Sequence, residues 1–132
     1  MPTVTPNFHF DGCCANAIAF YEKNLGAITT YRLTYGEAGG GSAEQAGWIY
    51  HAEMRIAGQC VWMSDGAAEA PGNTLSLAVT FDTAEEVRAA YAGMSQGCTV
   101  IHPMQSTGYS PCFVSFIDAY GMRWELLAGQ AG

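Results

Sequence analysis

The segment FDGCCANAIAFYEKNLG, residues 10–26, and the segment FDTAEEVRAAYAGMSQG, residues 81–97, share one layout. Each opens with Phe-Asp, continues with apolar residues at helical spacing and closes on a glycine. After each segment comes a loop and then a pair of apolar runs around a turn glycine, Gly58 in the first half and Gly121 in the second. Two copies of a long unit are too few for a solenoid. We therefore expect two similar units around a shared cleft.

Apolar and polar residues alternate in four segments of each half, which predicts four strands per unit. The predicted strands cover 3–10, 28–35, 48–56 and 59–64 in the first half, and 74–81, 98–104, 112–117 and 122–128 in the second. The first predicted helix runs from Cys14 to Leu25, and the second follows a capping box at 83–86. The result is an α+β fold of two βαβββ units, 1–65 and 74–128, within a single domain over 1–132. We expect paired half-sheets that enclose a central pocket, with the helices outside and a linker at 65–73.

Each helix must cover the apolar face of its own sheet. In the segment 48–56 the alternation assigns Trp48, Tyr50 and Met54 to the core, and in 74–81 it assigns Leu75 and Leu77 to the core. The polar residues then share the inner faces: Thr5, Asn7, His9, His51, Glu53, Arg55, Ser76, Thr80, Arg123 and Glu125. An inner surface of this kind predicts a small-molecule pocket.

Composition restricts the possible partners and the compartment. The chain has 132 residues, a net charge of −7 and only five Lys or Arg residues, which argues against nucleic acid and anionic membranes as partners. It has neither a membrane-length apolar run nor a signal-peptide pattern at its N-terminus, so we expect a cytoplasmic protein. Five cysteines without a C-x-x-C spacing favour buried thiols over disulfides or a zinc knuckle.

Several short motifs occur in a characteristic order: Phe10-Asp11-Gly12-Cys13 with Ala17 and Phe20-Tyr21, Tyr50-His51-Ala52-Glu53, Met63-Ser64-Asp65, Met104-Gln105, and Asp118-Ala119-Tyr120-Gly121-Met122-Arg123-Trp124. This order resembles the vicinal oxygen chelate superfamily of glyoxalases, bleomycin-resistance proteins and extradiol dioxygenases. It is closest to the PhnB-like branch, often described as 3-demethylubiquinone methyltransferase-like. The stretch 107–111 departs from the branch's usual Thr-Phe-Trp-Gly. The resemblance implies a homodimer with a small-molecule ligand.

The resemblance also implies four metal-ligand positions, which the repeat locates in this chain. Glu125 lies four residues after Gly121, and the corresponding residue after Gly58 is Trp62. Thr5 and Ser76 lie five residues before the two Phe-Asp pairs. Of these four residues only Glu125 is a usual ligand for zinc, iron or nickel. We therefore predict no metal and no cofactor, with a site built on His51 and Glu53 as the alternative.

Candidate site residues follow from the expected inner faces. Glu125, His51 and Glu53 are the candidates for acid–base catalysis, because a histidine next to a carboxylate suits proton transfer. Candidates for substrate binding are His9, Arg55, Trp62, Ser64, Asp65, Gln105, Tyr109 and Arg123, although Ser64-Asp65 also fits a simple turn. Two functions stay open: a metal-independent lyase, isomerase or transferase, or a protein that sequesters an apolar or aromatic compound without chemistry.

Overall fold

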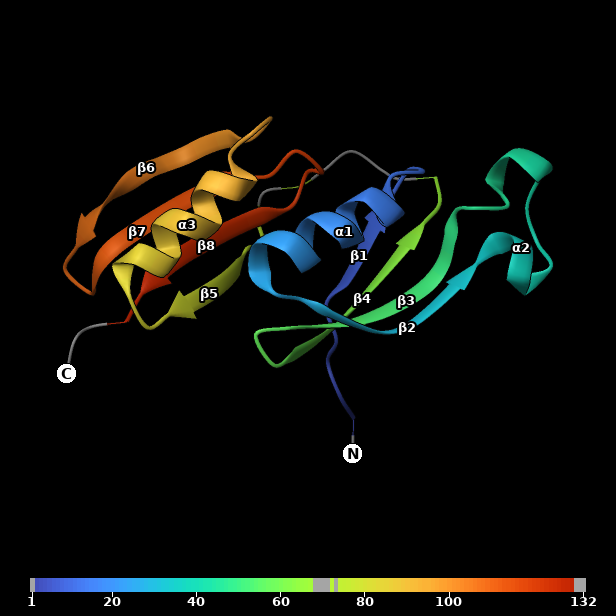
Figure 1. Cartoon of the computed structure of the whole chain (residues 1–132), viewed down its shortest axis with the longest axis horizontal. Helices are drawn as coiled ribbons and strands as arrows, with labels where there is room; N and C mark the ends of the chain where they lie inside the picture. Colours follow the sequence, from blue (N-terminus) through green and yellow to red (C-terminus); the bar gives the residue numbers. More distant parts are fainter. Residues whose placement is uncertain (1, 68–71, 73, 130–132) are drawn as a thin grey trace. The chain divides into compact units, whose positions relative to one another are not determined.

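A computed structural model of the chain describes residues 2–67, 72 and 74–129 (Figure 1). The chain divides into two compact units, Met1–Glu69 and Ala70–Gly132. Each unit has the order βαβββ and a four-stranded mixed sheet, so the predicted α+β fold is confirmed. The predicted linker spans 65–73, of which 68–71 and 73 lie outside the described residues. No helix in the described part is long and apolar enough to cross a membrane.

Unit 1 has its strands in the order β1-β4-β3-β2. Its elements along the chain are β1 (Asn7–Phe10), α1 (Cys14–Leu25), β2 (Ile28–Thr34), α2 (Tyr35–Ala38), the 3₁₀ turn η1 (Ala43–Gln45), β3 (Ile49–Ile56) and β4 (Gln59–Asp65). β1 and β4 are parallel, and the other neighbouring strands are antiparallel. The helix α1 lies across one face of this sheet (Figure 1).

The core of unit 1 forms between α1 and the covered face of its sheet. The helix buries Cys14, Ala17, Ile18 and Tyr21, which recur at helical spacing. The sheet contributes the buried residues Phe8, Phe10, Ala52, Met54, Ile56, Val61 and Met63. Alternation along the strands sends His51, Glu53 and Trp62 to the opposite side. We call that side the open face of unit 1, and define it by Tyr31, His51, Glu53, Arg55 and Trp62.

Unit 2 repeats the plan, with strand order β5-β8-β7-β6. Its elements are β5 (Leu77–Phe81), α3 (Ala84–Met94), β6 (Thr99–Thr107), β7 (Ser110–Ile117) and β8 (Arg123–Ala128). The predicted capping box starts α3: Thr83 Oγ1 accepts from the Glu86 N–H at 3.2 Å, and Glu86 Oε1 accepts from the Thr83 N–H at 3.1 Å. The helix buries Val87, Ala90 and Met94, and β8 buries Trp124, Leu126 and Ala128.

The alternation predicted for 48–56 is wrong at its start. Tyr50, expected in the core, is 54% exposed, whereas Ile49 is fully buried. The β2–β3 register passes from Leu33↔His51 to Thr34↔Ile49, so Tyr50 is an extra residue in β3. Such a β-bulge shifts the alternation by one position. Trp48 lies ahead of the strand and is only half-buried.

Several strand ends also differ from the prediction. β1 begins at Asn7 and β5 at Leu77, so Leu75 precedes the strand and is 76% exposed instead of buried. β6 continues to Thr107 and β7 already begins at Ser110, so most of residues 105–111 belong to a β-hairpin. Between the predicted strands 28–35 and 48–56 the structure also has α2 and η1, and Thr34 and Glu37 form a second capping box at the start of α2.

A close approach to Trp48 requires glycine at residue 12. Gly12 has φ +88, and a Cβ there would lie 2.9 Å from the Trp48 ring. Gly58 has a similar φ of +84 but no atom within 4 Å of such a Cβ, so it is a matched control. We expect Gly12→Ala to lower the free energy of unfolding by about 1–3 kcal/mol more than Gly58→Ala, because only Gly12→Ala adds overpacking. Urea unfolding measures the difference, and equal losses would contradict the packing argument.

Candidate functional site

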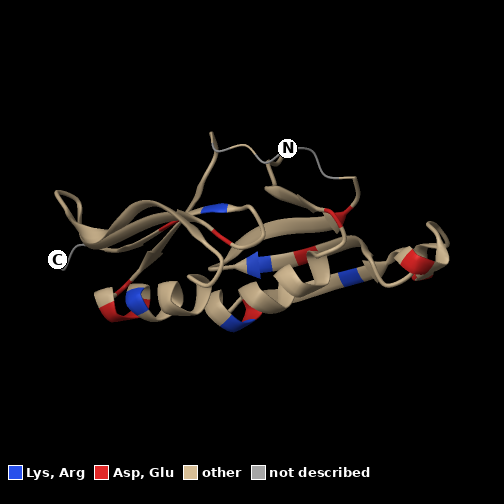
Figure 2. Cartoon of the chain, turned by 90° about the horizontal axis from the view of Figure 1, so that it is seen from above, with Lys and Arg blue, Asp and Glu red and all other residues tan. Residues whose placement is uncertain are grey.

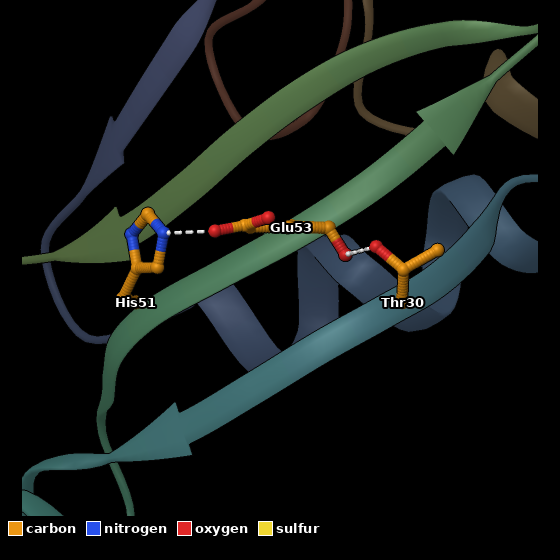
Figure 3. Close-up of polar contacts among 3 residues, drawn as sticks. All are labelled: Thr30, His51 and Glu53. Atoms are coloured by element: carbon orange, nitrogen blue, oxygen red, sulfur yellow. Dashed lines mark hydrogen bonds and ion pairs between the residues drawn. The ribbon is translucent and has the colours of Figure 1, made fainter.

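His51 and Glu53 form a hydrogen-bonded pair on the open face of unit 1 (Figure 3). They are two residues apart on β3, so their side chains project to the same side. The His51 Nε2 atom lies 2.9 Å from Glu53 Oε2, the distance expected when the ring N–H donates to the carboxylate. Their side chains are 31% and 38% exposed, which leaves both within reach of a ligand.

Two aromatic rings flank His51. Its ring centroid lies 5.3 Å from that of Trp62 on β4 and 6.1 Å from that of Tyr31 on β2. In the pairing register Glu53 is opposite both Trp62 and Tyr31. The pair therefore lies between aromatic side chains from both neighbouring strands.

A second bulge, at Thr30, places Tyr31 beside this pair. Thr29 pairs with Met54, but Tyr31 pairs with Glu53, so Thr30 is an extra residue in β2. Its Oγ1 donates to the Glu53 backbone oxygen at 3.1 Å (Figure 3). Thr29 lies on the covered side, where its hydroxyl donates to Glu22 of α1 at 2.9 Å. Sequence reasoning missed Tyr31, because only the register shows which face it occupies.

The Asp65 carboxylate holds the elements next to this site together. Its Oδ1 accepts from the backbone N–H groups of Gly12 and Cys14 at 2.9 and 3.0 Å, and its Oδ2 accepts from Ile49 N–H at 2.9 Å. Asp65 is only 5% exposed, and its backbone oxygen accepts from the Tyr35 hydroxyl at 2.6 Å. These contacts give Asp65 a structural role. The substrate contact expected of it stays a prediction.

The same carboxylate affects the two adjacent thiols. Burial, together with the negative charge of Asp65, raises the pKa of Cys14 to about 12 and also raises that of Cys13. Both side chains are therefore neutral thiols near neutral pH and poor nucleophiles. Neither belongs to the candidate site.

The other candidates in unit 1 lie on β1, β3 and β4. His9 is exposed and pairs in register with Ser64, which is half-buried. Arg55 is exposed and its Nη2 donates to the Gly58 backbone oxygen at 2.7 Å. This bond holds the guanidinium at the β3–β4 turn.

Unit 2 carries the remaining four candidates. Arg123 and Glu125 lie on β8, with Nη2 and Oε2 4.0 Å apart. Ser115 on β7 is opposite Glu125, and its hydroxyl is buried without a hydrogen-bond partner among the described residues. Gln105 on β6 is exposed, and Tyr109, 60% exposed, occupies the β6–β7 hairpin.

Comparison with known proteins identifies the family. Residues 10–126 match the Glyoxalase/Bleomycin resistance protein/Dioxygenase superfamily. The chain belongs to this superfamily. The resemblance read from the sequence motifs is thereby confirmed.

Individual relatives agree with this assignment. YjdN of Escherichia coli K12 is 26% identical, over 93% of this chain and 92% of YjdN. A PhnB protein from Bacillus cereus, named a putative 3-demethylubiquinone-9 3-methyltransferase, has a TM-score of 0.83 at 25% identity and covers 97% of this chain and 100% of its own. PA1353 from Pseudomonas aeruginosa has a TM-score of 0.88 at 21% identity, over 99% of this chain and 100% of its own.

The fosfomycin resistance protein FosX from Listeria monocytogenes has a TM-score of 0.69 at 16% identity, over 98% of this chain and 94% of FosX. At such identities PA1353 and FosX show the fold alone. The PhnB protein and YjdN extend the likeness to sequence.

The superfamily's metal positions can be checked in each unit separately. Asn7 pairs with Trp62, and Ala78 pairs with Glu125. Asn7 and Ala78 precede the Phe-Asp pair of their own half by the same number of residues. Trp62 and Glu125 are therefore equivalent, as the repeat predicts. Unit 1 has Thr5 and Trp62 at these positions, and unit 2 has Ser76 and Glu125. Only Glu125 is a usual ligand of a transition metal, so neither unit offers the residues that such a metal requires.

The alternative centre on His51 and Glu53 has two donors. No group of three or more His, Cys, Asp or Glu residues in the described ranges is arranged to hold a metal. The absence of a metal stays a prediction, which rests on the chemistry of the side chains present.

Replacing Asp65 with asparagine tests its link to the site. Asparagine keeps one acceptor oxygen but places an NH₂ group where the second carboxylate oxygen accepts from a backbone N–H. Because a backbone N–H then loses its acceptor, we expect Asp65→Asn to lower the free energy of unfolding by about 1–3 kcal/mol. Because Asp65 holds Ile49 next to the bulge, we also expect the His51 ring resonances to shift in NMR spectra.

The matched control is Asp118→Asn in unit 2. Asp118 accepts from Tyr120 N–H, Met122 N–H and Trp124 Nε1–H at 2.8, 3.0 and 2.8 Å, all near its own turn. We expect a similar loss of stability without the His51 shift. Unchanged His51 resonances in Asp65→Asn would disprove the link.

Proposed function

We propose that this chain is a small-molecule-binding protein whose ligand lies against the open face of unit 1. The observation that supports this is the partly exposed His51–Glu53 pair with the Trp62 ring 5.3 Å from His51. A polar pair beside aromatic surface is typical of ligand sites, where stacking provides contact area and polar groups fix orientation. His9, Arg55 and Ser64 from the same unit are proposed as further ligand contacts.

One form of this proposal is an enzyme. A histidine hydrogen-bonded to a carboxylate transfers protons, which a metal-independent lyase, isomerase or transferase requires. His51 would then be the acid–base residue and Glu53 would orient its ring. Glu125 is the corresponding candidate on the unit 2 sheet, where Gln105, Tyr109 and Arg123 are the proposed contacts.

The other form is a protein that sequesters an apolar or aromatic compound without changing it, as the bleomycin-resistance members of the superfamily imply. The exposed rings of Tyr31 and Trp62 favour this form. In either form we propose a cytoplasmic protein. Figure 2 shows the basic residues as separate segments, with no basic cluster in the described part of the chain, so a nucleic-acid partner is not proposed.

Native mass spectrometry of the purified protein, followed by a thermal-shift screen of small molecules, tests ligand binding. We expect at least one compound to raise the melting temperature, and the increase to be smaller in Trp62→Leu and Glu53→Gln. The exposed His102→Asn in unit 2 is the control. Elemental analysis of the same sample is expected to find no stoichiometric zinc, iron or nickel.

Product analysis of each bound compound separates the two forms. An enzyme converts the compound, and His51→Asn abolishes conversion while retaining binding. A sequestering protein leaves the compound unchanged, both in its unsubstituted form and as His51→Asn. If no compound binds, or if Trp62→Leu and Glu53→Gln show the same increase in melting temperature as the unsubstituted protein, the proposed site is wrong.

We also propose a twofold homodimer. Each sheet has unpaired edges, β1 and β2 in unit 1 and β5 and β6 in unit 2, and exposed edges favour pairing with another chain. Closed twofold dimers are the commonest soluble oligomers. Sedimentation equilibrium at micromolar protein is expected to give twice the chain mass of 14.1 kDa. A single species at the chain mass would refute the dimer.

A further inference from the structure

Glu53 lies between two aromatic residues in the strand register on the open face of unit 1. Tyr31, Glu53 and Trp62 are directly opposite one another on β2, β3 and β4. Neighbouring strands are about 4.8 Å apart, so the backbones of the two aromatic residues are about 10 Å apart, with that of Glu53 midway. Tyr31 is 47% and Trp62 36% exposed, so this row reaches solvent.

We infer that this row binds an organic ammonium cation. The inference rests on the proposed function and specifies its ligand class. Aromatic faces attract cations through their quadrupole, and Glu53 places a carboxylate in the same row to pair with a cation. The inference restricts the sequestering form of the proposed function to compounds that carry a cationic group, because a wholly apolar ligand would cover the Glu53 carboxylate without pairing it. An anion would meet that carboxylate directly and a chain of net charge −7.

The nearby polar groups support this assignment. His51 donates to Glu53 Oε2, which leaves Oε1 without another hydrogen bond among the described residues and available to a ligand. The His51 ring that binds the Glu53 carboxylate lies beside the rings of both Trp62 and Tyr31, so the carboxylate and the two aromatic rings share one site. The Arg55 guanidinium, also on the open face, donates to the Gly58 backbone oxygen, which holds it at the β3–β4 turn.

The test uses two pairs of probes that differ in charge. Choline is compared with its uncharged isostere 3,3-dimethylbutan-1-ol, and benzyltrimethylammonium with benzyl alcohol. NMR titration follows the Trp62 indole N–H. We expect each cation to shift this resonance and to bind about tenfold more tightly than its neutral counterpart, which corresponds to about 1.4 kcal/mol.

Three variants locate the binding. Glu53→Gln and Trp62→Leu are each expected to weaken cation binding by about fivefold to tenfold. Because Trp62→Leu lacks the indole N–H, its binding is followed through the His51 ring resonances, which both variants keep. Glu85→Gln removes the same charge from an exposed position on α3 and is expected to leave binding unchanged. It controls for the net charge of the chain.

The outcomes separate this inference from the proposed function. Equal binding of neutral and charged probes at Trp62 overturns the cation preference but keeps the open face as a binding surface. Cation binding that Glu53→Gln leaves unchanged overturns the role of the carboxylate. If neither cation binds, the inference is wrong. The proposed function is tested separately, by the thermal-shift screen of small molecules.

Discussion

The arrangement of unit 1 depends on one buried carboxylate. Asp65, at the end of β4, accepts hydrogen bonds from Gly12 just before α1, from Cys14 at the start of α1, and from Ile49 at the start of β3. Helix N-terminal donors have no partners within the helix, and Cys13, the residue before α1, supplies no side-chain cap. Asp65 meets that need from a distant part of the chain. Asp65 also binds the Ile49 N–H and so holds the start of β3 in place. The Tyr50 bulge and His51 come directly after Ile49 in that strand.

Unit 2 meets the same need locally. The position equivalent to Asp65 is Ala128, since Phe10 pairs with Asp65 and Phe81 with Ala128. There the helix α3 begins with the Thr83–Glu86 capping box, and the buried Ser110 hydroxyl donates to the Ala128 backbone oxygen at 2.6 Å. The two units thus share a backbone plan but stabilise their helix starts through different interactions.

The side chains at equivalent sheet positions also differ between the two units. Glu53 pairs with Trp62 in unit 1, and at the equivalent places Ser115 pairs with Glu125 in unit 2. Where unit 1 has a carboxylate and an aromatic ring, unit 2 has a hydroxyl and a carboxylate at the equivalent backbone positions. Superfamily membership therefore fixes where side chains project, and the side chains themselves determine what each face can bind.

The sequence by itself determined the repeat, the βαβββ order, the Thr83 capping box and the equivalence of Trp62 and Glu125, because periodicity and short-range hydrogen bonds are local properties. It also brought His51 and Glu53 to one strand face. The bulges at Thr30 and Tyr50, the place of Tyr31 beside His51 and the contacts of Asp65 with Gly12 and Ile49 were decided only in the tertiary structure. These features depend on strand register and on residues far apart in the chain, which no local pattern encodes.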